Sequence, residues 1–351
     1  MFTSRISLPY RRLILVLIST SFLTILLILH LKNDIYSLWT LLSLPFSWPR
    51  GSESFYISRE VDEFDVSFAN YSETETSAGD NYTARIPALL HHISLGPAPT
   101  RDSWAEARQS CLDAHPDWQA ILWNDENAGK FIAERFAAFK PTWDSYRFLI
   151  QKVDALRYLV LYEFGGVILD MDLHCKRSLG PLRRFHFVAP AAFPTGFSIS
   201  FMMAERHSEF VKQLIQNLKA YDRRWFYLPY PTIMFSTGGH FASAIHTLQS
   251  NRSEFKVLTG PKNDFWQHSL NGPVSTPLFD HLGSASWHSY DGRLLVLLVE
   301  CVKWMLPILI IGVVCFLLLV TDRLSLLVRK WRLQPPNTEL EEKDLEDRWV
   351  R

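Results

Sequence analysis

The chain carries two long stretches without a charged residue, one near each end. Residues 13–31 and residues 304–320 contain no Lys, Arg, Asp or Glu and are rich in Leu, Ile and Val. Each stretch has about the length of a helix that crosses a lipid bilayer once. We therefore expect a transmembrane helix at each, with the rest of the chain organised around them.

Basic residues flank both stretches on their outer sides. The nearest are Arg11, Arg12 and Arg323, and Arg5, Arg329, Lys330 and Arg332 lie further out. Positive residues collect on the cytoplasmic side of membrane helices, so residues 1–12 and 321–351 are expected in the cytoplasm and the intervening chain in a lumen. A cleaved signal peptide is the competing interpretation of the first stretch, and a buried core helix is that of the second.

Between the two stretches, short hydrophobic runs alternate with helical patterns. Residues 86–93 and 119–123 predict buried strands, and residues 104–115 predict a helix. A further helix follows residue 123, with Asn124 or Asp125 as its N-cap. This alternation predicts an α/β domain with a mainly parallel sheet over residues 85–293.

The residues between the first apolar stretch and this domain have little regular pattern. Residues 32–84 include Pro45, Pro49 and a tract rich in Ser, Glu and Thr. We expect them to form a stem that spaces the domain from the membrane.

Two further features agree with a lumenal domain. N-glycosylation sequons lie only between the apolar stretches, at Asn70, Asn81 and Asn251. Cys111 and Cys175 lie in the same interval and are able to pair in an oxidising compartment, although the sequence does not establish that they do.

The overall charge excludes one class of partner. Lys and Arg total 36, as do Asp and Glu, so no nucleic acid partner is indicated. Hydrophobic residues make up 48% of the chain, which the two apolar stretches help to explain.

The most informative run lies at residues 153–172. Apolar residues recur at helical spacing, then Gly165 and Gly166 provide the flexible positions that end a helix. A short buried strand follows and ends at Asp170 and Asp172. The apolar residues of the helix are Val153, Leu156, Leu159 and Val160.

Two carboxylates one residue apart predict a metal site. Alternate residues of an extended segment point the same way, so Asp170 and Asp172 are expected to face one hard cation, Mg²⁺ or Mn²⁺. Such an ion commonly binds a substrate diphosphate, which is the chemistry of a nucleotide-sugar glycosyltransferase. An Asp-x-Asp triplet alone arises by chance about once in a chain of this size, so the whole run carries the interpretation.

The helix before the strand supplies two more candidates. Asp154 and Arg157 are three residues apart and share a helical stripe. We interpret Asp154 as an acceptor for ribose hydroxyls and Arg157 as a fork-like donor to phosphate. A solvated surface ion pair is the structural alternative.

With these pieces in place, the chain resembles the family 32 glycosyltransferases, the DxD sugar-transferase family that includes fungal mannosyltransferases. The resemblance covers residues from about 85 to about 291. It implies a GT-A fold, dependence on a divalent metal and retention of anomeric configuration. The motifs that carry it are Ile86-Pro87 with His91 and Gly96, Asp154 to Tyr158 with Arg157, Gly165-Gly166, Asp170-Met171-Asp172, Ser236 to Gly238, and Ser286-Trp287-His288 with Asp291.

The resemblance also implies residue roles. The helix residues and Trp287 would hold the donor, Asp170 would help to position its sugar and ribose, and Asp172 would ligate the metal. The expected catalytic residues are Asp170 and Asp172, the expected substrate-binding residues are Asp154, Arg157, Gly166 and Trp287, and the expected metal ligands are Asp172, Asp170 and His288.

Within the family, the likeness is greatest to the fungal inositol phosphorylceramide mannosyltransferases. This implies transfer of mannose from GDP-mannose to a sphingolipid head group, with Mn²⁺ or Mg²⁺, by a two-pass Golgi membrane protein with a lumenal catalytic domain. A separate regulatory membrane subunit is a plausible partner. Ser94 stands where family members often carry a base-stacking Trp, so GDP versus UDP stays open.

Three alternatives remain at this stage. A family member that uses another nucleotide sugar or a glycoprotein acceptor comes first. The others are a catalytically silent membrane subunit and a hydrolase with paired acids, although acids one residue apart are poorly placed to flank a scissile bond.

Overall fold

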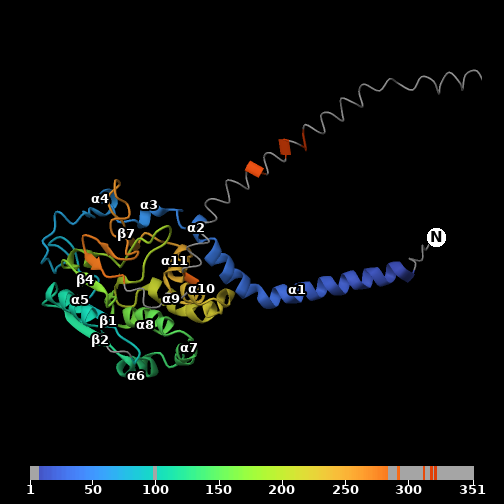
Figure 1. The fold of residues 1–351 in the computed structure, drawn as a ribbon, viewed down its shortest axis with the longest axis horizontal. Coiled ribbons are helices and arrows are strands. Elements are labelled where there is room, and N and C mark those ends of the chain that lie inside the picture. Colours follow the sequence, from blue (N-terminus) through green and yellow to red (C-terminus); the bar gives the residue numbers. More distant parts are fainter. Residues whose placement is uncertain are drawn as a thin grey trace, which may run out of the picture. The chain divides into compact units, whose positions relative to one another are not determined.

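The first of two compact units contains all the described strands of this protein (Figure 1). The units comprise residues 1–287 and 288–351. The computed structural model describes residues 8–97, 101–283, 291–292, 311–312, 317–318 and 320–321.

A six-stranded mixed sheet forms the centre of the first unit, in the order β2-β1-β3-β6-β5-β7. β1 pairs in parallel with β2 and β3, and β5 with β7, whereas β6 is antiparallel to both β3 and β5. The strands are β1 (Leu89–Ile93), β2 (Gln119–Trp123), β3 (Gly166–Leu169), β5 (Phe187–Pro190), β6 (Phe201–Ala204) and β7 (Phe255–Leu258).

The expected parallel character therefore holds for three of the five strand pairs in this sheet. β6 departs from it because only ten residues, 191–200, separate it from β5. A connection of that length without a crossover helix returns the chain antiparallel. A second, smaller sheet is antiparallel and has the strand order β4-β9-β8. Its strands are β4 (Leu173–Cys175), β8 (Val274–Ser275) and β9 (Phe279–His281).

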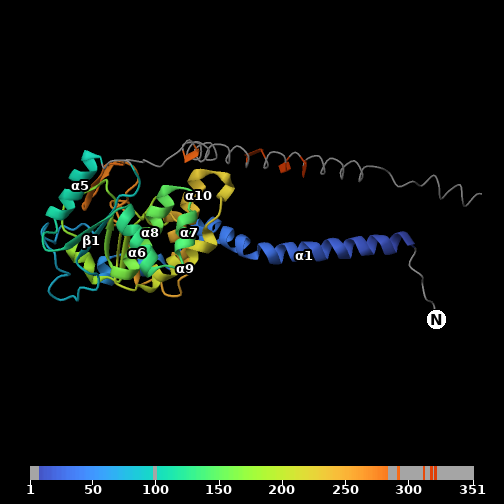
Figure 2. The same cartoon turned by 90° about the horizontal axis from the view of Figure 1, so that it is seen from below.

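Helices cover the large sheet (Figures 1 and 2). The predicted strand at 119–123 is confirmed as β2, the predicted helix at 104–115 is α5, and Asn124 caps α6 by accepting from Asn127 N–H at 3.0 Å. The longer helices are α5 (Asp102–Asp113), α6 (Asp125–Arg135), α7 (Lys140–Ser145), α8 (Leu149–Phe164), α9 (Glu209–Tyr221), α10 (Pro229–Ser236) and α11 (Gly239–Thr247). The short ones are α2 (Leu44–Ser47), α3 (Ser52–Phe55), α4 (Arg59–Asp62), η1 (Gly180–Arg184) and η2 (Trp225–Tyr227).

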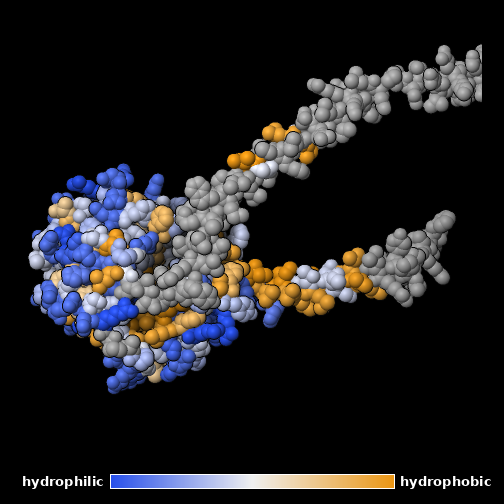
Figure 3. Space-filling model, viewed as in Figure 1, coloured by the Kyte–Doolittle hydropathy of each residue, from blue (hydrophilic) through white to orange (hydrophobic). Residues whose placement is uncertain are grey.

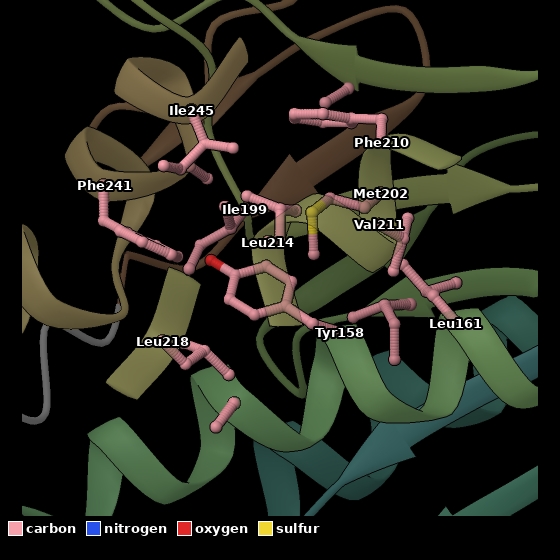
Figure 4. Close-up of a cluster of buried hydrophobic side chains, with 14 of the residues drawn as sticks. Tyr158, Leu161, Ile199, Met202, Phe210, Val211, Leu214, Leu218, Phe241 and Ile245 are labelled. Carbon is pink, nitrogen blue, oxygen red and sulfur yellow. The ribbon is translucent and has the colours of Figure 1, made fainter. Parts of the chain in front are cut away.

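The helix α8 runs through the core, which suits its high content of apolar residues. Its residues from Asp154 to Leu161 are all buried. Figure 4 shows Tyr158 and Leu161 of α8 among side chains of α9, β6 and α11. Burial on nearly every side fixes the position of α8, and therefore of the polar residues it carries toward the sheet.

The two glycines after α8 are required by both backbone and packing. Gly165 and Gly166 have φ of +66° and +95°, and a Cβ on Gly166 would lie 2.5 Å from the carbonyl oxygen of Leu89. The His91 Nε2–H donates to Gly165 O at 2.9 Å, while its Nδ1 accepts from the Trp123 indole at 3.2 Å. This packing accounts for Gly166, and its expected contact with substrate stays a prediction.

Part of the segment expected to be a stem contributes to the core. Trp48, Phe55 and Phe64 are buried, and the backbone next to them pairs with β7 through Ile57 N–H, which donates to Val257 O at 3.0 Å. These residues belong to the folded unit. A spacing role for residues 32–84 stays a prediction.

The first helix, α1 (Leu8–Leu42), continues well past the predicted span. Within the described part of the chain, Leu15–Leu42 is the one helix long and apolar enough to cross a membrane. Residues 15–30 are exposed and hydrophobic for most of their length (Figure 3), whereas Ser37, Thr40 and Leu41 are buried against the domain. Most of the predicted second span, 304–320, lies outside the described residues, so that span stays a prediction.

Cys111 of α5 and Cys175 of β4 form a disulfide. The bond ties α5 to the short strand that follows the Asp170–Asp172 motif. A disulfide agrees with residence in an oxidising compartment.

Burial lowers the pKa of several histidines in the domain. Burial lowers the pKa of His115 to about 4. Its Nδ1–H donates to Cys111 O at 2.7 Å, and its Nε2 accepts from Leu179 N–H at 2.8 Å, a pattern that only the neutral ring can make. Burial likewise lowers the pKa of His91, His92, His246 and His268 to about 4, 3, 3 and 4.

We predict that the free energy of unfolding falls as the pH drops from about 6.5 toward 4. The unfolded chain takes up protons on these rings below a pKa of about 6.5, whereas the folded chain does not, so acid favours unfolding. His115→Gln should remove one proton's share of this slope, about 1.4 kcal/mol per pH unit. Thermal unfolding of the full chain in detergent at several pH values measures the slope, and exposed His174→Gln is the control. A melting temperature that does not change between pH 7 and pH 5 would contradict the prediction.

Candidate functional site

The Asp170–Asp172 motif forms a tight turn between the two sheets. Leu173 N–H donates to Asp170 O at 3.2 Å and closes the turn, and Asp170 N–H donates to Ser200 O at 2.9 Å. The expectation of an extended segment is wrong here, because β3 ends at Leu169 and the turn sets the direction of the carboxylates. The motif still emerges at the carboxyl edge of the parallel strands β1, β2 and β3, where ligands bind in such sheets.

Arg157 holds the first carboxylate of the motif. Its Nη2 donates to Asp170 Oδ1 at 2.5 Å, and the Asp170 side chain remains 24% exposed. Burial raises the pKa of Asp170, the Arg157 charge opposes this shift, and the Asp172 charge adds to it. Two like charges at one partly buried turn favour a cation nearby.

A buried network behind Asp170 holds Arg157 in turn. Arg157 Nη1 lies 3.3 Å from Asp154 Oδ1 and donates to Ile199 O at 3.2 Å. Thr237 Oγ1 donates to Asp154 Oδ2 at 3.0 Å. Burial raises the pKa of Asp154 to about 6, against the opposing effects of Arg157 and Thr237.

This network changes how the two helix residues are interpreted. Asp154 and Arg157 are an internal ion pair and not a solvated surface pair, since both side chains are almost fully buried. Both terminal nitrogens of the Arg157 guanidinium are occupied by protein oxygens, and one of them holds Asp170. The expected contacts of Asp154 with ribose and of Arg157 with phosphate stay predictions.

The Ser236–Gly238 motif reaches the same network. It lies at the junction of α10 and α11, where Thr237 also accepts a hydrogen bond from Tyr158 Oη through its carbonyl oxygen. Gly238 is the N-cap residue of α11, and Gly239 is its first residue. The motif therefore holds Asp154 by one carboxylate oxygen, while Arg157 lies against the other.

His281 contacts Asp172, and no sequence pattern had singled it out. His281 Nε2 lies 3.4 Å from Asp172 Oδ2, and both side chains are largely buried. Pairing of β4 with β9 sets Leu173 opposite His281, and Leu282 N–H donates to Asp172 O at 2.9 Å. Burial alone would lower the pKa of His281, but its hydrogen bond with Asp172 and the charges of Asp172 and Asp170 raise it.

The described residues supply part of a metal site. Among them, no group of three or more His, Cys, Asp or Glu side chains is arranged to hold a metal ion. A cation at Asp170 and Asp172 would therefore complete its coordination with substrate oxygens, water or residues beyond this part of the chain. The expected ligand His288 and the expected diphosphate contact Trp287 lie outside the described residues.

This chain is similar to known proteins over the residues that form the site. The family model described as "Glycosyltransferase sugar-binding region containing DXD motif" matches residues 101–188, which include α8, the two glycines and the Asp170–Asp172 turn. Inositol phosphoceramide mannosyltransferase 1 of Schizosaccharomyces pombe is 32% identical over 245 residues, which are 68% of this chain and 73% of that protein. The chain belongs to this DXD glycosyltransferase family.

Other relatives match a smaller part of this chain. Mannosyl phosphorylinositol ceramide synthase SUR1 of Saccharomyces cerevisiae is 37% identical over 214 residues, 60% of this chain and 54% of that protein. The chain thus spans about half the length of that relative. Among solved structures, PaToxG glycosyltransferase overlaps 50% of this chain and 74% of its own at a TM-score of 0.38 and 16% identity. Fold comparison at that level adds nothing to the sheet order given above.

We predict that Arg157→Ala strongly destabilises the domain. It leaves buried Asp154 and partly buried Asp170 without their counter-charge, and breaking a buried pair from one side costs about 3–5 kcal/mol. Arg157→Lys should recover part of this loss, because one ammonium replaces a fork. Denaturant unfolding measures both variants, with exposed Arg206→Ala as control. An Arg157→Ala protein as stable as the native chain would refute the network.

Proposed function

We propose that this chain is a membrane-bound mannosyltransferase of sphingolipid synthesis, which transfers mannose from GDP-mannose to inositol phosphorylceramide with retention of configuration. The similarity to inositol phosphoceramide mannosyltransferase 1, over 73% of that protein, carries the proposal. The Asp170–Asp172 turn at the carboxyl edge of the sheet supports it, since a donor diphosphate and its cation need oxygen ligands at such an edge.

Asp170 and Asp172 are the proposed ligands of a divalent cation, Mn²⁺ or Mg²⁺. Their hard carboxylate oxygens suit either ion, and the like charges at the turn are relieved by a cation. When bound, such an ion offsets the negative charge that develops on the departing diphosphate. Under this proposal Trp287 and His288 add a diphosphate contact and a third protein ligand.

The remaining site residues orient the carboxylates and the donor. Arg157 of α8 and His281 of β9 each hold one carboxylate of the motif. Asp154 is enclosed by Arg157 and Thr237, so it is poorly placed to attack an anomeric carbon. We therefore favour attack by the acceptor hydroxyl on the face of the leaving group, and trapping of a covalent sugar–enzyme adduct would reject it.

The proposal includes a Golgi membrane location with a lumenal catalytic domain. Exposed apolar α1 supports a membrane anchor, and the Cys111–Cys175 disulfide supports an oxidising lumen. A second span at 304–320 and a regulatory membrane subunit belong to the same proposal.

A second candidate is transfer from another nucleotide sugar. Ser94 follows β1 at the place where relatives often carry a base-stacking Trp, and its N–H donates to Trp123 O at 2.8 Å. This difference concerns the nucleotide and leaves the carboxylates unchanged. A catalytically silent subunit is disfavoured, because such a subunit has no need of a second carboxylate, Asp172, beside Asp170 at the carboxyl edge of the sheet.

The test is incubation of membranes that contain the full chain with labelled GDP-mannose, UDP-galactose or UDP-glucose and inositol phosphorylceramide. We expect mannose in the sphingolipid fraction, and label from a UDP-sugar alone would favour the second candidate. Asp172→Asn should abolish transfer with folding intact, whereas Asp280→Asn, on the exposed side of the neighbouring strand, should not. Native turnover in Asp172→Asn would remove the metal-site assignment.

His281→Gln should weaken metal binding by about 10- to 100-fold, because the residue that orients a ligating carboxylate contributes to affinity. The free Mn²⁺ signal in electron paramagnetic resonance titrations of the full chain measures this directly, without an activity assay. His174→Gln, on β4 but exposed, is the matched control. Equal Mn²⁺ affinity in both variants would show that His281 does not orient Asp172.

A further inference from the structure

The loop between α9 and α10 exposes two aromatic side chains from an unusual backbone. Phe226 and Tyr227 have φ of +53° and +56° and are 56% and 86% exposed. Left-handed backbone is costly for residues other than glycine. Packing within the domain does not repay this cost, because both rings largely face outward. Arg223 and Arg224, which precede them, are exposed as well.

This loop is fixed to α1. Arg223 Nε donates to Asp34 Oδ1 of α1 at 2.8 Å. His240 of α11 donates through Nε2 to Leu41 O at 2.8 Å, and its ring lies 4.6 Å from that of Phe235, which in turn lies 6.2 Å from Phe226. Figures 1 and 2 both show α9 and α10 at the end of the domain where α1 enters. These contacts therefore fix the position of the loop along the axis of α1.

The rise of the helix per residue gives the distance of the loop from the uncharged part of α1. The uncharged stretch of α1 ends at Leu31, and Asp34 lies three residues on, or about 4.5 Å along the helix axis. The head-group layer on each side of a bilayer is about 5–7 Å thick. The ion pair between Asp34 and Arg223 consequently falls within that layer when residues up to Leu31 occupy the hydrocarbon.

We propose that Ile35, Tyr36, Arg223, Arg224, Phe226 and Tyr227 form a membrane-contact surface that seats the domain on the bilayer crossed by α1. This inference rests on the proposed membrane anchor. Arginines pair with lipid phosphates and aromatic rings favour the interface, so the residue types suit this layer. Ile35 and Tyr36 are exposed on α1 one and two residues beyond Asp34 and continue the surface along the helix.

The bilayer suits this surface better than a protein partner does. The surface follows the exposed apolar residues 15–30 along α1, and it combines cations with aromatic residues beside the ion pair of Arg223 with Asp34. Contact here holds the catalytic domain close to the membrane. An acceptor whose head group extends little from the bilayer is then within reach of the site.

Depth measurements on the full chain test the surface. Tyr227→Cys in a Cys301→Ala, Cys315→Ala background carries a polarity-sensitive fluorophore, and the chain is reconstituted alone in phosphatidylcholine vesicles. Val61→Cys, 61% exposed in α4, is the matched control. We expect the label at 227 to emit at shorter wavelength and to be quenched by nitroxide lipids, and the label at 61 to be quenched by aqueous iodide.

Flotation with vesicles separates the two proposals. A chain that fails to float refutes the anchor, and the surface with it. A chain that floats, with the label at 227 as open to iodide as the label at 61, refutes the surface alone and assigns these residues to a protein partner. Phe226→Cys supplies a second label position should Tyr227→Cys fail to fold.

Discussion

A single buried guanidinium joins the parts of this site. Arg157 lies on a helix enclosed by the core, and its three contacts reach Asp154 of the same helix, the carbonyl of Ile199 in the link before β6, and Asp170 at the end of β3. A charge buried to this degree is stable only with such partners, and each partner is equally dependent on it. The position of Asp170 is therefore set by the core and not by the mobility of a loop.

The second carboxylate is held from a different direction. Asp172 lies at the start of the small sheet, against His281, while Asp170 belongs to the end of the large one. The two acids are close in sequence, yet Arg157 of α8 orients one and His281 of the small sheet orients the other. The Cys111–Cys175 bond ties β4 to α5 and so limits movement between the two supports. Such rigidity suits the proposed binding of a cation and a diphosphate, because side chains held in place lose little freedom on binding.

Much of the fold and part of the site could be predicted from the sequence. Periodicity identified β2 and α5, local capping chemistry left Asn124 and Asp125 as the candidate caps of α6, and the two glycines marked the end of α8. These signals are local. His281 could not be predicted, because a three-residue strand has too few positions to show a pattern and its contact depends on pairing with a distant strand. The role of Arg157 as a buried ion-pair partner was not predicted, because helical spacing does not reveal which side of a helix is buried. The turn at Asp170–Asp172 resembles a strand end in sequence, and only the hydrogen bond from Leu173 distinguishes them.

The segment between α1 and β1 packs against the domain, and this packing has a practical consequence for protein production. Trp48 and Phe55 fill the core beside β7, and Lys256 of β7 forms a buried ion pair with Asp62 at 2.6 Å. A secreted version trimmed to the apparent domain start at residue 85 would lose these groups, uncover the edge of β7 and leave Lys256 with an unbalanced charge. A soluble version of the domain for crystallisation therefore calls for a cut within α1, after the uncharged stretch that ends at Leu31 and before Ser37, so that the part of α1 packed on the domain is retained.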